Sequence, residues 1–154
     1  DLDYNKKMKK YIHENSLEAQ HLEFSESCHT VEDAAKAVNG SVNEFVKNIC
    51  MAGENGQLIV AIIKGEDRAS TSRVGKALNI PRPRLANEEE ILKGTGYPAG
   101  GVPSFGFDAI FLIDPRVMEL TYVYTGGGSP NSLIKISVTE LLKANKGRVV
   151  RIRK

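Results

Sequence analysis

The sequence predicts a mixed α+β fold: a curled, largely antiparallel or mixed sheet of about six or seven strands, barrel-like, with helices packed outside. Short β-branched segments and short amphipathic segments alternate irregularly along the chain. Several neighbouring strands are joined by connections too short for a parallel crossover. Because 41% of the 154 residues are apolar, the chain can close one core, and we expect a single domain over residues 1–154.

The first predicted elements are a helix, a strand and a second helix. Residues 5–17 place apolar side chains at helical spacing among lysines. Residues 20–25 alternate between apolar and polar side chains, as a short strand does. Thr30 starts a capping box that opens a helix over 31–39, and Gly40 is expected to end it.

A β-hairpin is predicted next, in the middle of the sheet. Residues 44–51 have apolar side chains on both faces, and residues 57–64 are β-branched and apolar throughout. The segment between them, GENG, has the composition of a turn.

Two helices follow the hairpin. Ser70 is a candidate cap for a helix over 70–79, which the prolines after it stop. Asn87 caps the following helix, and Gly94 is expected to close it.

The last third of the chain is predicted to be mostly strands. Residues 107–113, 118–124 and 133–137 have strand patterns. Ser137 caps a final helix over 138–145, and residues 148–153 are predicted to form a last strand.

Composition excludes several classes of protein. The chain has no apolar run of the roughly 20 residues that cross a bilayer, so we expect a soluble cytoplasmic protein. The two cysteines are too few for a disulfide framework, which favours a reducing compartment. His21, Cys28 and His29 match no common zinc spacing, so no metal and no other cofactor is predicted. The net charge of +2 permits contact with a phosphate backbone but is far below that of a typical DNA-binding protein.

The segment KGTGYPAGGVPSFGF, residues 93–107, is rich in glycine and proline. Residues 94–99 match the dinucleotide pattern GxGxxG/A, which requires a strand before it and a helix after it. A helix precedes this segment and Gly100 to Pro103 cannot start one, so we reject a nucleotide cofactor.

Two interpretations of the segment stay open. It is either a connection in which Gly96 and Gly100 supply positive φ, or a stiff loop whose exposed amides hold an oxyanion, a ribose or a phosphate.

Lys47 is a single lysine inside a predicted central strand. It either protects the sheet margin or points into a cleft. Strand alternation sends Asn48 to the opposite face unless the strand bulges there.

Three segments together resemble a known family. They are TVEDAAKAVNGSVNEFVKNICM (30–51), RVGKALNIPRPRLANEEEILKGTGYPAGGVPSFG (73–106) and DPRVMELTYVYTGGGSPNSLIKIS (114–137). They are similar to the stand-alone aminoacyl-tRNA deacylases of the YbaK type and to the editing domain inserted in bacterial prolyl-tRNA synthetases. The resemblance spans residues 30–142, and its most specific part is the middle segment.

This resemblance implies a trans-editing hydrolase that removes a small amino acid, such as alanine, cysteine or serine, from a mischarged tRNA, expected to be that for proline. The implied partners are the aminoacylated 3′ end of the tRNA and prolyl-tRNA synthetase, with no DNA and no membrane. In such proteins activity depends on the strand lysine, and the glycine-rich loop borders the pocket. The implied catalytic residues are Lys47, Gly100, Gly101 and Val102, and the implied substrate-binding residues are Asn48, Ser104, Gly126, Gly127 and Gly128.

Two departures from the family pattern are present. Pro103 follows Val102 at once, and Ser104 stands where many members have proline. The late segment TGGGSPN lacks the histidine of the alanine-specific members, which leaves the substrate amino acid open. The alternative is a non-catalytic module of the same fold that binds tRNA or a synthetase.

Overall fold

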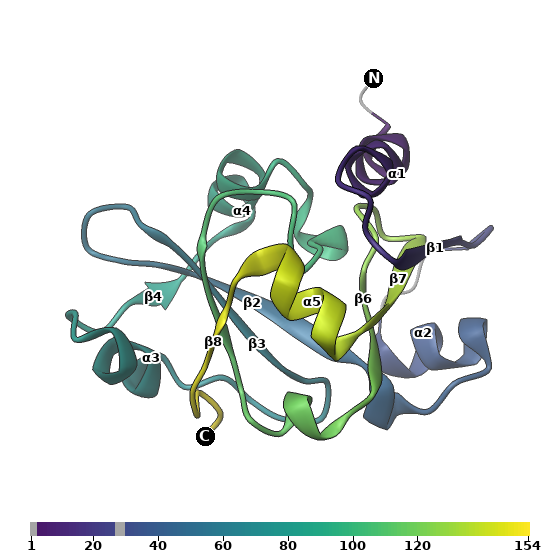
Figure 1. The fold of residues 1–154 in the computed structure, drawn as a ribbon. Helices are drawn as coiled ribbons and strands as arrows, with labels where there is room; N and C mark the ends of the chain where they lie inside the picture. The colour runs from purple at the N-terminus through teal and green to yellow at the C-terminus, as the bar shows by residue number, and fades with distance from the viewer. Residues whose placement is uncertain (1–2, 27–29) are drawn as a thin grey trace.

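The computed structural model describes residues 3–26 and 30–154, and in them the strands form two sheets (Figure 1). One is antiparallel and has the order β1–β7–β6, formed by Ala19–Glu23, Ser132–Ser137 and Tyr122–Gly126. The other is mixed and has the order β4–β2–β3–β5–β8. Its strands are Arg84–Leu85, Val46–Ala52, Leu58–Lys64, Ile110–Ile113 and Arg148–Val149. The mixed α+β class is therefore confirmed.

The barrel-like outline is not confirmed. The β2–β3 hairpin is antiparallel as predicted, but β3 pairs in parallel with β5, and β5 in parallel with β8. After β5 the chain turns at Asp114 through the 3₁₀ turn η3 (Val117–Glu119) and enters β6, which belongs to the other sheet. Within residues 3–26 and 30–154, one isolated bridge, Phe45 to Tyr124, joins the two sheets, so their strands remain in two separate ladders.

The helices are α1 (Tyr4–Glu14), α2 (Val31–Val38), α3 (Thr71–Leu78), α4 (Glu88–Thr95) and α5 (Val138–Asn145). The last four begin where their caps predict. The side chains of Thr30, Ser70, Asn87 and Ser137 each accept a hydrogen bond from a backbone amide in the first turn of their helix. Each cap satisfies one of the amides that a helix start leaves unpaired.

Two of the predicted helix ends are wrong. The left-handed residue after α2 is Asn39 rather than Gly40, because asparagine also tolerates this conformation. Gly94 lies inside α4, and Gly96, with a φ of 80°, ends that helix. Gly100 does not have the positive φ that we expected, because it lies in the 3₁₀ turn η2 (Ala99–Gly101).

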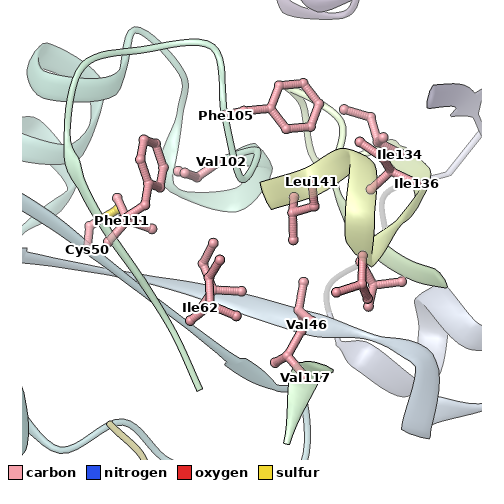
Figure 2. Packing of buried hydrophobic residues seen from close by; sticks show 14 of the residues in the cluster. Val46, Cys50, Ile62, Val102, Phe105, Phe111, Val117, Ile134, Ile136 and Leu141 are labelled. Carbon is pink, nitrogen blue, oxygen red and sulfur yellow. The ribbon is translucent and has the colours of Figure 1, made fainter. Parts of the chain in front are cut away.

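Apolar side chains fill the space between α5 and the β2–β3 hairpin (Figure 2). Leu141 of α5 points toward the hairpin, where it meets Val46 and Ile62, and Phe105 of the glycine-rich loop closes the top of this core. The opposite face of the five-stranded sheet packs against α3 through Ile63 and the buried Val74. The hairpin is therefore covered on both faces, which explains its continuous apolar pattern.

Asp114 fastens the end of the chain to the sheet. Its carboxylate is fully buried and accepts hydrogen bonds from the amides of Ile152, Arg153 and Arg116 and from the Arg153 guanidinium. Burial alone raises the pKa of this carboxyl group, but these hydrogen bonds outweigh burial and hold the pKa below its ordinary value.

We expect Asp114→Asn to lower the free energy of unfolding at pH 7 by about 3 kcal/mol, because Arg153 loses its buried partner. A carboxyl group with a lowered pKa stabilises the fold above its unfolded pKa, about 3.9, and this stability is lost as pH falls through the folded pKa. The difference between variant and wild type should therefore shrink below about pH 4. Urea unfolding at pH 7 and at pH 3 measures both values, and a difference that is the same at the two pH values would contradict the prediction.

In the residues that the structure describes, no helix has the length and apolar character needed to cross a membrane. Cys28 and His29 lie outside the described residues.

Candidate active-site pocket

A pocket of about 280 Å³ opens where the start of β2 meets β6, η2 and helix α2. Lys47, Gly100 and Gly126, which lie far apart in the sequence, all line this pocket. Among the described residues that line the pocket, Lys47 is the one that is charged, and apolar side chains form much of the rest. The remaining lining residues are Thr30, Val31, Ala34, Phe45, Val46, Tyr124, Thr125, Pro130, Ser132 and Leu133.

The position of Lys47 follows from how β2 is paired. β3 covers one edge of β2 along its whole length, whereas β4 covers the other edge only at Met51 and Ala52. The Lys47 end of β2 is therefore not covered by β4, and β6 of the other sheet lies close to β2. The Lys47 ammonium donates a hydrogen bond to the backbone carbonyl of Asp67 at 2.6 Å. An ammonium has three N–H bonds, so this contact fixes the group and uses one of them.

Asn48 lies on the other face of β2. The pairing with β3 is continuous through Lys47–Ile63 and Asn48–Ile62, so the strand does not bulge. The Asn48 Nδ2 donates to the Val102 carbonyl at 2.9 Å and to the Thr125 hydroxyl at 2.8 Å. Asn48 therefore holds the glycine-rich loop from behind and is absent from the lining of the pocket.

Ser104 completes this network. It is fully buried, and its hydroxyl donates to the Asn48 Oδ1 at 2.6 Å and lies 2.7 Å from the Thr125 hydroxyl. Because the Val102 carbonyl can only accept, the Asn48 amide has one possible orientation, and its oxygen takes the single Ser104 hydrogen. The Thr125 hydroxyl must then donate to Ser104. All three side chains are thus satisfied by one another and by the loop.

Removing one member of this network should destabilise the protein. We expect Thr125→Val, which keeps the side-chain shape, to lower the free energy of unfolding by about 1–3 kcal/mol, since an Asn48 N–H and the Ser104 oxygen lose their partner. Urea unfolding measures this difference. A suitable control is Thr139→Val, because Thr139 is exposed on α5, and that change should leave stability within about 0.5 kcal/mol. Equal stabilities of Thr125→Val and wild type would contradict the network.

The glycine-rich loop packs backbone against backbone on the β6–β7 turn. The Gly101 amide donates to the Pro98 carbonyl, and the Gly101 carbonyl accepts from the Gly128 amide at 2.8 Å. A Cβ on Gly101 would lie 2.4 Å from the Ser129 nitrogen, and a Cβ on Gly126 would lie 2.1 Å from the Val102 oxygen. Both positions therefore require glycine, because a side chain would separate the two segments.

The structure brings only some of the expected site residues together. Gly100 lines the pocket with Lys47, whereas Gly101 is buried with its amide already used. Val102 is buried and presents its carbonyl to Asn48.

The late glycines divide in the same way. Gly126 lines the pocket, whereas the two glycines after it are buried and do not line it. The Gly127 carbonyl oxygen lies 2.8 Å from the His21 ring nitrogen Nε2, within hydrogen-bond distance, and Gly128 has a φ of 109°.

Helix α1 holds both loops from outside. The Lys7 ammonium donates to the Gly96 carbonyl at 2.8 Å and lies 4.4 Å from the centre of the Tyr97 ring. Asn5 accepts a hydrogen bond from the Ser129 hydroxyl at 2.7 Å. The two loops that border the pocket are thus fixed to the same helix.

Sequence reasoning missed Thr30 and the residues of α2 that line the pocket, and in β6 it found Gly126 but missed Tyr124 and Thr125. Thr30 and Thr125 gave the available signals: Thr30 is a cap at the end of a loop, and Thr125 is a hydroxyl residue at the end of a strand and directly before the glycine run. Neither signal shows that α2 and β6 meet, because the contact between them depends on how the strands of the two sheets pair.

A family model described as an aminoacyl-tRNA editing domain matches residues 25–144. YwhH, an uncharacterised protein of Bacillus subtilis, is 28% identical over 129 residues, which are 82% of each chain. The proline–tRNA ligase of Pseudothermotoga lettingae is 27% identical over 99 residues, which are 64% of this chain but only 17% of the ligase.

Solved structures share the fold over nearly all of the chain. The crystal structure of protein APE2540 has a TM-score of 0.87 and 28% identity and covers 96% of this chain and 99% of that one. A proposed trans-editing enzyme for prolyl-tRNA synthetase has a TM-score of 0.88 and 25% identity and covers 100% of this chain and 99% of that one.

Proposed function

We propose that this chain, which belongs to the family of aminoacyl-tRNA editing domains, hydrolyses the ester that joins a small, wrongly attached amino acid to the terminal ribose of a tRNA. The observation that supports this most is that Lys47 and Gly100 line one pocket, although they lie on different elements. The proposal includes a cytoplasmic location and a tRNA for proline as the substrate, and the relatives among proline–tRNA ligases support the second point.

The chemistry needs few groups, because an aminoacyl ester is already reactive. Water attacks the ester carbonyl carbon, the bond from this carbon to the ribose oxygen breaks, and the ribose oxygen leaves with a proton taken from the water. We assign stabilisation of the negative carbonyl oxygen in the transition state to the Lys47 ammonium and the Gly100 amide. Positioning of the water against the ester supplies the rest.

The size of the pocket favours a small amino acid. Its volume of about 280 Å³ lies just below the range for small-molecule sites, about 300–1,000 Å³. Such a pocket excludes larger amino acids by their size, but it separates alanine, serine and cysteine poorly, because one methylene or hydroxyl contributes only about 1–3 kcal/mol.

The test is a panel of tRNAs for proline charged with alanine, cysteine, serine or proline. The release of labelled amino acid is followed with and without the protein, and we expect faster release of at least one of the small amino acids than of proline. If the protein accelerated none of the four reactions, it would not be a deacylase of this kind.

The rival function is a non-catalytic module that binds tRNA or a synthetase. It is favoured by the fact that the Gly101 amide and the polar groups of Asn48 and Ser104 are all engaged within the protein. This rival predicts binding to uncharged tRNA, weakened steeply by salt, without any ester cleavage.

A further inference from the structure

Charge is distributed unevenly along the chain. Residues 68–87 and 141–154 contain no aspartate or glutamate, yet they carry eleven of the 21 lysines and arginines. The rest of the chain carries ten basic residues and all 19 acidic ones. The net charge of +2 is therefore the sum of two strongly basic segments and a remainder of the chain that is acidic.

The two basic segments lie side by side in the fold. The Lys154 amide donates to the Arg68 carbonyl at 2.8 Å, and the Arg148 guanidinium donates to the Ala77 carbonyl at the end of α3, also at 2.8 Å. Figure 1 shows the C-terminus close to the loop that leads from β3 to α3. The two segments therefore form one basic surface, consisting of Arg68, Arg73, Lys76, Arg148, Arg151 and Lys154.

The side chains of this basic surface are exposed and lack acidic partners. All six residues are exposed, and within the described part of the chain none of them forms a salt bridge. Other cations of the same segments are used internally: Arg84 pairs with Glu90, and Arg153 pairs with Asp114. Neighbouring cations without counter-charges repel one another, and a polyanion relieves this repulsion.

The basic surface begins beside the pocket. The Lys47 ammonium is bonded to the Asp67 carbonyl, and the next residue, Arg68, belongs to the surface. Glu66 and Asp67 directly precede Arg68 in this loop, and the carboxylate of each forms a salt bridge with Arg116. A phosphate backbone that leaves the pocket can therefore pass this loop without meeting an unpaired acidic residue.

We infer that the basic surface binds the phosphate backbone of an RNA whose 3′ end enters the pocket. The placement of the 3′ end in the pocket rests on the proposed function. A pocket of about 280 Å³ holds only the end of such a chain, so most of the affinity must come from contacts outside it. Arginine is well suited to this role, because its guanidinium donates two parallel hydrogen bonds to a phosphate.

The test measures binding of an uncharged RNA, so it does not depend on ester hydrolysis. The probe is a fluorescein-labelled RNA stem-loop with a single-stranded CCA 3′ end, and anisotropy gives Kd at several salt concentrations. The variant carries Arg73→Gln, Lys76→Gln and Arg151→Gln. The control carries Lys6→Gln, Lys10→Gln and Lys93→Gln, three exposed lysines outside the basic surface, and loses the same charge.

We expect the variant to bind the RNA at least about 10-fold more weakly than the wild type. The slope of log K against log salt is negative, and we expect it to become shallower by roughly 2, since each of the three lost contacts with a single strand contributes about 0.7. The control should keep the affinity and slope of the wild type. If variant and control bound the RNA equally weakly, the effect would depend only on net charge, and the inference would be overturned. Wild-type protein that bound phosphatidylserine vesicles but not the RNA would overturn it too.

Discussion

Lys47→Met is expected to slow ester hydrolysis by about 10²- to 10³-fold, the loss measured when one donor to a developing oxyanion is removed. Methionine keeps most of the side-chain length but removes the charge and the donors. Single-turnover hydrolysis of a mischarged tRNA measures the effect on the chemical step. Hydrolysis at the wild-type rate would exclude Lys47 from the proposed mechanism.

The fold should survive this change. The bond from the charged Lys47 ammonium to the Asp67 carbonyl contributes about 1.5–3 kcal/mol, so the free energy of unfolding of Lys47→Met should fall by no more than that amount. Lys47→Arg is the matched variant, because it keeps the charge but spreads it over a planar group. We expect it to fold normally and to recover only part of the activity, since the small pocket has little room for a guanidinium.

Gly101→Ala should unfold much more readily than Gly100→Ala, although the two glycines are neighbours. An alanine Cβ at Gly101 would lie 2.4 Å from the Ser129 nitrogen and 2.5 Å from the Gly128 carbonyl carbon, which are backbone atoms that cannot move alone. At Gly100 the nearest atom would be a Pro130 ring carbon at 3.4 Å, an ordinary contact. We expect Gly101→Ala to cost about 3 kcal/mol of stability and Gly100→Ala less than about 1 kcal/mol.

Thermal and urea unfolding of the two variants measure this contrast. Gly126→Ala serves as a second test of the same packing, since its Cβ would lie 2.1 Å from the Val102 oxygen. We expect it to be as unstable as Gly101→Ala. If both glycines accepted alanine without loss of stability, the close packing of the two loops would not contribute to the fold.

Local features of the fold were predictable from the sequence because they depend on neighbouring residues. The caps at Thr30, Ser70, Asn87 and Ser137 each fix a helix start by contacts within one turn. The division into two sheets was not predictable in this way. It depends on where the chain goes after Asp114, and the strand pattern on either side of this residue is the same whether β5 and β6 pair or separate.

The site shows the same limit. Strand alternation correctly separated Lys47 from Asn48, because the period of a strand is a local property. The roles of the glycines were harder to distinguish. Gly100 and Gly101 are neighbouring glycines that the sequence alone does not distinguish. Gly101 packs against the β6–β7 turn and is buried, whereas Gly100 lines the pocket. Thr125 was missed because its partners, Asn48 and Ser104, come from two other segments.

The bond between the Lys47 ammonium and the Asp67 carbonyl also affects the entropy of substrate binding. A lysine side chain that is free in solution loses about 2 kcal/mol of rotamer entropy when it is immobilised. Here folding immobilises it, before any ligand arrives. A ligand that meets Lys47 therefore finds a side chain already in one conformation, and more of the contact energy remains as affinity.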